Sequence, residues 1–194
     1  MMFKIKELGR TYIIKPVALL LSKIGVKPMV ITLLSLLLAI IAFFFYRSGH
    51  FLTGAVFLVL SGLFDAFDGE VARLTGRVSQ IGGFIDSTID RISEFFIFFG
   101  LFLFYRGTMP WVLPWIFTAF FGSIMVSYTR ARGEGLGISP QIGIFERFFR
   151  FCLLTIGSFL GHYIMSYVLI LLTFGTLLTM IRRIFYIHKA SGRN

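Results

Sequence analysis

Long apolar stretches separated by short polar segments dominate the chain. Six of them approach the roughly 20 residues that a bilayer-spanning helix needs. They run over about 28–46, 51–67, 82–105, 110–128, 142–162 and 163–184, and the second continues as a helix to about residue 75. None shows the apolar and polar alternation of a barrel strand. The pattern therefore predicts an all-α integral membrane protein with six transmembrane helices.

Residues 1–22 follow a different pattern, in which apolar and basic side chains interleave. Phe3 and Leu8, for example, stand among Lys4 and Arg10. This mixture is typical of an amphipathic helix that lies on the membrane surface. We therefore expect one domain over 1–194, made of a juxtamembrane helix at 1–22 and a six-helix bundle at 28–184.

Composition supports the membrane assignment. Hydrophobic residues make up 57% of the 194 residues and charged residues 14%, whereas soluble domains carry roughly 25% charged residues. A chain of this size could not bury that much apolar surface in water, and it is too apolar to be disordered. The formal net charge of +10 does not indicate nucleic-acid binding, because the sequence has no soluble basic domain.

The basic residues favour one orientation in the bilayer. Most Lys and Arg fall before the first span, after the even-numbered spans and beyond the sixth span, and only Arg47 and Arg106 fall on the other side. Basic loops face the cytoplasm in most membrane proteins. The sequence thus predicts a multi-pass protein of the cell membrane with both termini in the cytoplasm.

The acidic residues are strongly clustered. Six of the nine lie at the end of the second span and the start of the third, namely Asp65, Asp68, Glu70, Asp86, Asp90 and Glu94. Asp65 and Asp68 are three residues apart and Asp86 and Asp90 are four apart, so each pair shares one helix face. Intramembrane carboxylates are costly and mark functional sites. We expect the two faces to meet at the cytoplasmic edge of the bundle.

Divalent cations would relieve the repulsion among the four aspartates. Oxygen ligands without a nearby His or Cys favour Mg²⁺ or Mn²⁺ over zinc. Four carboxylates can hold two ions, and such a pair serves phosphoryl transfer. Glu70 points away from the Asp65 face and is expected to pair with Arg73 or Arg77, and Glu94 with Arg91.

Residues 65–90 read DAFDGEVARLTGRVSQIGGFIDSTID. The run resembles the signature of the CDP-alcohol phosphatidyltransferases, DxxDGxxAR followed after eight residues by GxxxDxxxD. Every specified position is filled. The resemblance implies a membrane transferase that moves a phosphatidyl or archaetidyl group from a CDP-linked lipid to the hydroxyl of an alcohol, with release of CMP.

The resemblance also implies roles for single residues. Two metal ions would be bound by Asp65, Asp68 and Asp86. Asp90 would complete the metal shell and act as the general base. The CDP group would be held by Asp68, Gly69, Ala72, Arg73 and Thr32. Thr32 belongs to a run similar to the family's PNxxT, in which Met29 replaces Asn. The family further implies a homodimer.

The acceptor is indicated by two basic runs, SYTRARGEG at 127–135 and ER at 146–147. A phosphorylated alcohol needs guanidinium partners, whereas free serine or choline does not. The runs are similar to the branch that makes phosphatidylinositol phosphate or archaetidylinositol phosphate, although the family's ERPER-like run is altered here to ERFFR. Inositol phosphate is therefore the favoured acceptor, and its phosphate would contact Ser127, Arg130, Arg147 and Arg183.

Other functions stay open at this point. Glycerol 3-phosphate is a second phosphorylated acceptor, and CDP-inositol, as in di-inositol phosphate synthesis, is another donor. A small transporter is a different class, but a conduction path needs polar groups through the full depth of the membrane. Here the charges gather at one edge. The sequence does not choose between Mg²⁺ and Mn²⁺, or between diacyl and ether-linked lipids.

Overall fold

The computed structural model describes residues 10–140 and 142–191, and every regular element in these ranges is a helix. Proline stands at the first or second position of several helices, as at Pro28 and Pro114, and Gly161 directly precedes the last helix. The elements are η1 (Arg10–Ile14), α2 (Lys15–Lys23), α3 (Pro28–Arg47), α4 (Phe51–Leu74), α5 (Gln80–Thr108), η2 (Pro110–Val112), α6 (Leu113–Gly135), α7 (Arg147–Phe159) and α8 (His162–Ser191).

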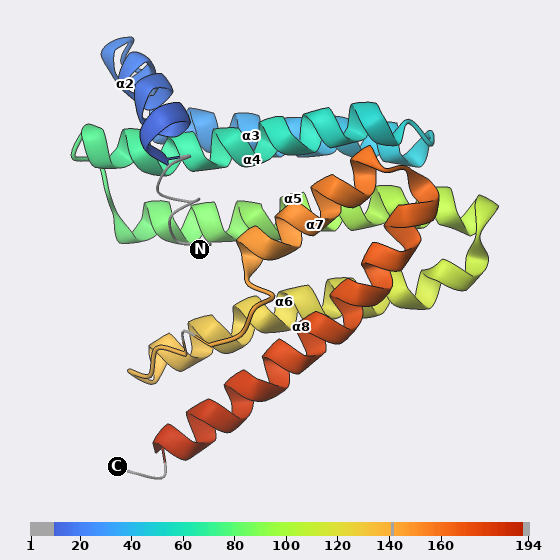
Figure 1. Cartoon of the computed structure of the whole chain (residues 1–194). Helices are drawn as coiled ribbons and strands as arrows, with labels where there is room; N and C mark the ends of the chain where they lie inside the picture. Colours follow the sequence, from blue (N-terminus) through green and yellow to red (C-terminus); the bar gives the residue numbers. More distant parts are fainter. Residues whose placement is uncertain (1–9, 141, 192–194) are drawn as a thin grey trace.

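The long helices form two groups. In Figure 1, α3, α4 and α5 run side by side, while α6 and α8 lie together below them and α7 crosses between the groups. Glycines allow the closest contacts. A Cβ atom on Gly100 of α5 would stand 2.8 Å from the carbonyl oxygen of Phe43 in α3, and Gly122 of α6 faces Thr176 of α8 in the same way. Close backbone approach at small residues is typical of membrane helices.

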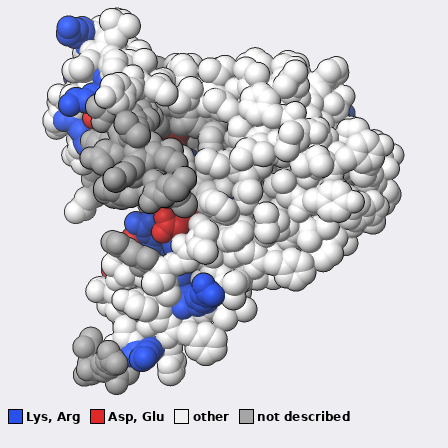
Figure 2. Space-filling view, viewed as in Figure 1, with Lys and Arg blue, Asp and Glu red and all other residues white. Residues whose placement is uncertain are grey.

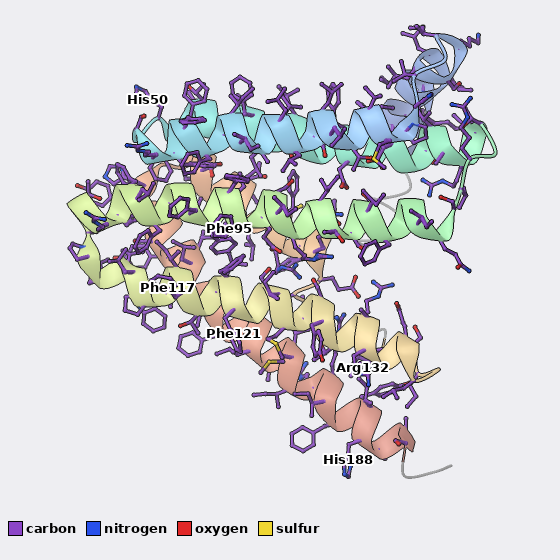
Figure 3. The ribbon with its side chains drawn as sticks, turned by 180° about the vertical axis from the view of Figure 1, so that it is seen from behind. His50, Phe95, Phe117, Phe121, Arg132 and His188 are labelled. Atoms are coloured by element: carbon purple, nitrogen blue, oxygen red, sulfur yellow. The ribbon has the colours of Figure 1, made fainter. Side chains whose placement is uncertain are left out.

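Four helical segments are long and apolar enough to cross a membrane. They are Pro28–Arg47, Phe51–Leu74, Pro110–Gly135 and His162–Ser191. Large apolar side chains such as Phe117 and Phe121 point away from the bundle and are 60% and 53% exposed (Figure 3). An apolar outer surface of this kind requires lipid. The chain is therefore an integral membrane protein.

The third and fifth predicted spans, which correspond to α5 and α7, are not among these four segments. α5 has 29 residues but carries Asp86, Asp90, Arg91 and Glu94 along its first half. α7 has 13 residues and begins at Arg147, whereas the sequence predicted a span from 142. The helix starts late because Gly143 has a φ of +107°, in the left-handed region. The six-span count remains a prediction.

The predicted amphipathic helix at 1–22 is described only in part, because residues 1–9 lie outside the described residues. Within it, η1 leads into α2, which ends at Lys23 before Gly25, whose φ is +80°. Ala18 is buried and packs in a small core with Ile31, Phe67 and Val71. α2 therefore touches the bundle at the end of α4, close to the acidic residues.

The basic residues visible in Figure 2 lie mainly at one end of the molecule, where α2 and the end of α8 are found. His50 and His188 stand at opposite ends (Figure 3). The acidic residues visible in Figure 2 belong to the basic end. This asymmetry is what the sequence pattern predicted.

Candidate active site

Three aspartates from two helices come together at the basic end of the bundle. Asp65 and Asp68 lie on α4 and Asp86 on α5, and one oxygen atom from each lies within 4.8 Å of the other two. α4 and α5 run in opposite directions, joined by a short turn at Gly76, and α3 packs against both. Ser79 caps α5 by accepting a hydrogen bond from the Gly82 amide at 3.0 Å. The predicted meeting of the two acidic faces is confirmed.

The cluster fits a divalent cation. Oδ2 of Asp68 and Oδ1 of Asp86 are buried and have no hydrogen-bond partner among the described residues. A buried carboxylate oxygen without a partner is strongly unfavourable, and a cation coordinated between the aspartates would satisfy it. The all-oxygen donor set suits Mg²⁺ or Mn²⁺.

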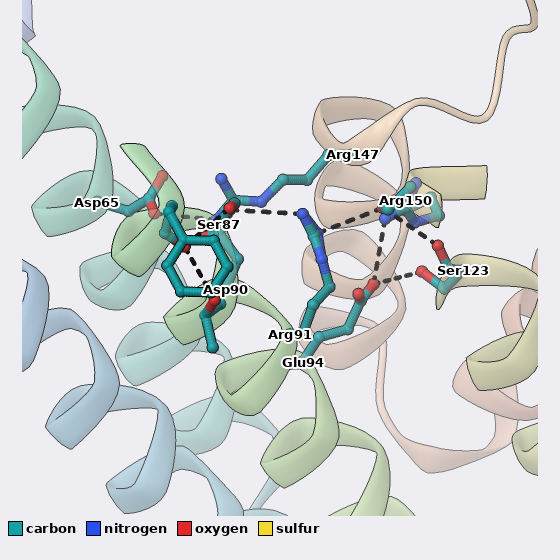
Figure 4. A network of polar contacts seen from close by, with 11 residues as sticks. Asp65, Ser87, Asp90, Arg91, Glu94, Ser123, Arg147 and Arg150 are labelled. Atoms are coloured by element: carbon teal, nitrogen blue, oxygen red, sulfur yellow. Dashed lines mark hydrogen bonds and ion pairs between the residues drawn. The ribbon is translucent and has the colours of Figure 1, made fainter. Parts of the chain in front are cut away.

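Asp90 lies one helical turn further along α5, outside this three-carboxylate group, and is 7% exposed. Nη2 of Arg147 contacts Oδ1 of Asp90 and lies 3.0 Å from Oδ1 of Asp65. Nη2 of Arg91 lies 3.9 Å from Oδ2 of Asp90. The first residue of α7 thus bridges α4 and α5 through their carboxylates (Figure 4).

A cavity of about 580 Å³ adjoins the aspartates. The residues predicted to hold CDP all contribute to its wall, namely Thr32, Asp68, Gly69, Ala72 and Arg73. Sequence reasoning missed two further cations, Lys27 and Arg77, which also line it. Both follow a glycine within two residues, and such a glycine indicates a turn. The sequence did not indicate that these two turns border the same cavity.

Arg73 is held at the cavity wall by Glu70. The Nη2 and Nε atoms of Arg73 donate to Oε2 of Glu70 at 2.8 and 3.1 Å, and the Glu70 side chain is 5% exposed. The predicted pairing of Glu70 with Arg73 is confirmed. It fixes the direction of a guanidinium group whose side chain is otherwise 54% exposed.

The four residues predicted to bind the acceptor phosphate have different surroundings. Arg147 reaches the aspartates, and Ser127 accepts a hydrogen bond from Nη1 of Arg91 at 3.3 Å. Arg130 is half-exposed and pairs with Glu134 at 2.9 Å. Arg183 is 1% exposed and donates to the carbonyl oxygens of Val126 and Ile142 at 2.6 and 3.0 Å.

A buried polar network behind these residues was not predicted. Oε1 of Glu94 accepts a hydrogen bond from Ser123 of α6 and lies 3.4 Å from Nη2 of Arg150 in α7 (Figure 4). The expected pairing of Glu94 with Arg91 was therefore wrong. A second cavity, of about 70 Å³, lies between this network and Asp90 and is also lined by Ser35 and Ser61.

Apolar helices long enough to cross a bilayer, with clustered carboxylates beside a large cavity, define an integral membrane enzyme that uses divalent cations. The family model of the CDP-alcohol phosphatidyltransferases matches residues 26–188. The chain belongs to this family, so the assignment predicted from residues 65–90 is confirmed.

Similar proteins include synthases of inositol phosphate lipids. Archaetidylinositol phosphate synthase of Methanothermobacter thermautotrophicus is 40% identical over 161 residues, which cover 81% of this chain and 80% of that protein. Phosphatidylinositol phosphate synthase of Streptomyces avermitilis is 33% identical over 197 residues, covering 94% of this chain and 80% of that protein.

Solved structures show the same fold. The crystal structure of Mycobacterium tuberculosis phosphatidylinositol phosphate synthase with CDP-DAG bound matches with a TM-score of 0.81 at 26% identity, covering 90% of this chain and 93% of that one. The structure of the same enzyme in complex with manganese and citrate gives a TM-score of 0.82 at 27% identity, covering 90% and 88%.

The cavity wall offers a direct test. We expect Ala72→Leu to weaken binding of a CDP-linked lipid about tenfold or more, because the added methyl groups occupy the cavity and a tenfold change is only about 1.4 kcal/mol. Binding is measured by calorimetry on protein in lipid nanodiscs. Ala131→Leu, the same change at an exposed position of α6, is the control and should leave this affinity unchanged. Equal affinities for both variants would contradict the cavity as the CDP site.

Proposed function

We propose that this enzyme transfers a phosphatidyl or archaetidyl group from a CDP-linked lipid to a hydroxyl of inositol phosphate and releases CMP. The observation that carries the proposal is the position of Arg147, whose guanidinium group contacts Asp65 and Asp90, and all three residues line the 70 Å³ cavity. A phosphate-binding group so close to the carboxylates suits an acceptor that is itself phosphorylated. The names of the relatives in M. thermautotrophicus and S. avermitilis support the same acceptor.

The 580 Å³ cavity is proposed as the CDP subsite. Gly69 and Ala72 leave room for the nucleotide against α4, and Arg73, directed by Glu70, would bind a phosphate. Thr32 closes the cavity from α3. The CDP-DAG bound to the M. tuberculosis enzyme supports a CDP-linked lipid as donor.

We assign two divalent cations to Asp65, Asp68, Asp86 and Asp90. Such ions neutralise the pyrophosphate of the donor and the charge that develops on the departing CMP. The manganese in the M. tuberculosis complex supports Mn²⁺ as one suitable ion. Because Asp65 is shared by the three-carboxylate group and by the contact with Arg147, we assign it to both ions.

Asp90 is proposed as the general base. Its carboxylate would take the proton of the acceptor hydroxyl while that oxygen forms a bond to the β-phosphorus of the donor. The bond between this phosphorus and the oxygen of CMP breaks, and CMP leaves with the bonding electrons. The shielded position of Asp90, at 7% exposure, favours proton transfer from a bound hydroxyl over exchange with bulk water.

The acceptor phosphate is assigned to Ser127, Arg130, Arg147 and Arg183. Arg147 contacts Asp90 directly, and Ser127 is linked to Asp90 through Arg91, which lies close to both. Arg130 lies one turn beyond Ser127 on α6. Arg183 would contribute positive charge from behind, since Nη2 of this residue is 3.7 Å from Glu146, the neighbour of Arg147.

We further propose six spans, with both termini and the site in the cytoplasm, and a homodimer. The gathering of basic residues at the end that carries the aspartates supports this orientation. The apolar second half of α5, which is 29 residues long, supports counting it as a span.

A CMP-release assay with purified enzyme tests the proposed acceptor. CDP-linked lipid is supplied with inositol phosphate or glycerol 3-phosphate, in Mg²⁺ or Mn²⁺, and CDP-inositol is tested as donor in place of the lipid. We expect CMP only when CDP-lipid and inositol phosphate are both present. Release with glycerol 3-phosphate but not inositol phosphate would reverse the choice of acceptor.

A further inference from the structure

The four aspartates fall into two arrangements. Asp68 and Asp86 have buried oxygens without partners and are open to a cation, together with Asp65. The Asp65 and Asp90 pair is instead bridged by the Arg147 guanidinium group, whose Nη2 atom touches both carboxylates (Figure 4). One subsite is therefore ready for a metal ion, whereas the other already holds a positive charge.

Arg147 is far more exposed than Arg150, one turn further along α7. The Arg150 side chain is 3% exposed and is fixed by the Phe145 carbonyl oxygen at 3.1 Å and by Glu94 at 3.4 Å. The Arg147 side chain is 47% exposed, and its ion pairs join it to aspartate side chains. Arg147 also begins α7, so its side chain stands at the end of the helix and not within it. Its exposed guanidinium group is accessible to a further anion.

We propose that Arg147 and a divalent cation exclude each other at the Asp65 and Asp90 pair, and that the phosphate of the acceptor draws Arg147 away and so opens this pair to the second ion. The inference rests on the proposed role of Arg147 as an acceptor ligand. Its consequence is an order of assembly, in which the first ion binds at Asp65, Asp68 and Asp86, and the second binds together with the acceptor.

The charges explain why the two cations compete. A divalent ion placed between Asp65 and Asp90 would stand beside a guanidinium group that is now in direct contact with both residues, and like charges at that distance repel. A phosphate dianion offers Arg147 a forked, charge-assisted partner of the kind that a carboxylate offers. Ligands that shift the same group help each other's binding by equal factors, commonly about 5–150-fold.

Manganese binding by protein in phosphatidylcholine nanodiscs, without CDP-lipid, tests this. The free Mn²⁺ signal in electron paramagnetic resonance is followed with and without inositol phosphate, and with inorganic phosphate as a second probe. For the unsubstituted protein we expect one tight ion and one weak ion, and the phosphate compounds should tighten the weak ion at least about fivefold. In Arg147→Gln, the second ion should bind tightly without any phosphate, and phosphate should add nothing further.

Arg130→Gln is the matched control, because it removes an exposed arginine of the same proposed subsite that pairs with Glu134 and not with an aspartate. It should leave the second ion weak in the absence of phosphate. Arg147→Lys keeps a positive charge and should also leave it weak, and it serves if Arg147→Gln is poorly folded. An unchanged second affinity in Arg147→Gln would overturn the proposal, as would phosphate that still tightens manganese in that variant, since phosphate would then act on the metal directly.

The manganese-binding experiment and the CMP-release assay can each fail without the other. If CMP release with inositol phosphate is found but Arg147→Gln leaves manganese binding unchanged, the function stands and the competition does not. If the manganese linkage is found with inorganic phosphate but no CMP is released with inositol phosphate, the competition stands and the acceptor was misassigned.

Discussion

Asp90→Asn should lower the rate of CMP release at least about a hundredfold, the lower end of what a positioned general base contributes. The amide cannot take the proton of the acceptor hydroxyl. It also has nearly the same shape as the carboxylate, so the packing around a side chain that is 7% exposed is preserved. The measurement is the steady-state rate of CMP formation at saturating CDP-lipid and inositol phosphate.

The same variant should keep its first metal ion, because Asp65, Asp68 and Asp86 form the three-carboxylate group without Asp90. Manganese titration followed by electron paramagnetic resonance provides this control. Tight binding of one ion with lost turnover excludes a collapsed site and leaves the loss at Asp90 itself, in its two proposed roles as base and as ligand of the second ion. An Asp90→Asn enzyme that turns over as fast as the original would show that another group accepts the proton.

The second large effect is expected for Asp68→Asn, which should weaken the first manganese ion by more than about a hundredfold. Even groups that only orient a metal ligand contribute 10–100-fold, and Asp68 is assigned as a ligand itself. Its Oδ2 atom is buried without a hydrogen-bond partner among the described residues, so no nearby donor replaces the lost cation contact. Activity should fall with metal binding, and a raised Mn²⁺ concentration should restore part of it.

Glu70→Gln provides a matched control for this second variant. Glu70 is also buried on α4, at 3% exposure, but its carboxylate faces Arg73 and not the aspartates. Loss of one negative charge there should leave manganese affinity unchanged. If both variants weakened manganese equally, the effect would reflect the overall charge of the helix end, and the assignment of Asp68 as a ligand would be wrong.

The acidic cluster could be predicted from the sequence because its geometry is local. Spacings of three and four residues set the faces of two helices, and the short connection between the helices brings those faces together. The residues predicted to hold CDP line one cavity for the same reason, since Gly69, Ala72 and Arg73 lie on the turns of α4 that follow Asp68.

Contacts between helices that are far apart in the sequence could not be predicted from residue spacing. Arg147 is 82 residues from Asp65, and its approach depends on how α7 packs against α4. Arg183 was predicted as a ligand of the acceptor phosphate, but the sequence did not indicate that α8 continues to Ser191 and buries this side chain among backbone carbonyl oxygens. Glu94 pairs with Arg150 because α7 returns to α5, and no periodicity in the sequence indicates that return.

The predicted start of the fifth span was wrong for a similar reason. Ile142, Ile144 and Phe145 are apolar and were predicted to begin a span. In the structure, Gly143 and Phe145 instead pack against Thr179 and Gly175 of α8. The irregular chain before α7 therefore uses its apolar residues to pack on α8. A run of apolar residues in the sequence looks the same in such a contact as in a membrane span.

The shortness of α7 also decides how deep the chemistry lies. The rings of Phe51 and His162 are 6.0 Å apart, which brings the starts of α4 and α8 to one level at the end of the bundle away from the aspartates. From there, Asp65 is about 21 Å along α4, and α7 spans about 20 Å, at 1.5 Å per residue. In the proposed orientation both would end inside the hydrocarbon layer, which is about 30 Å thick.

Irregular chain at this depth survives only where protein satisfies its polar groups, and the carbonyl oxygens of Ile142 and Phe145 receive their hydrogen bonds from Arg183 and Arg150. Under the proposed function, inositol phosphate would have to reach the aspartates below the level of the headgroups. A CDP-linked lipid could meet it at that depth with its hydrocarbon tails still in the leaflet.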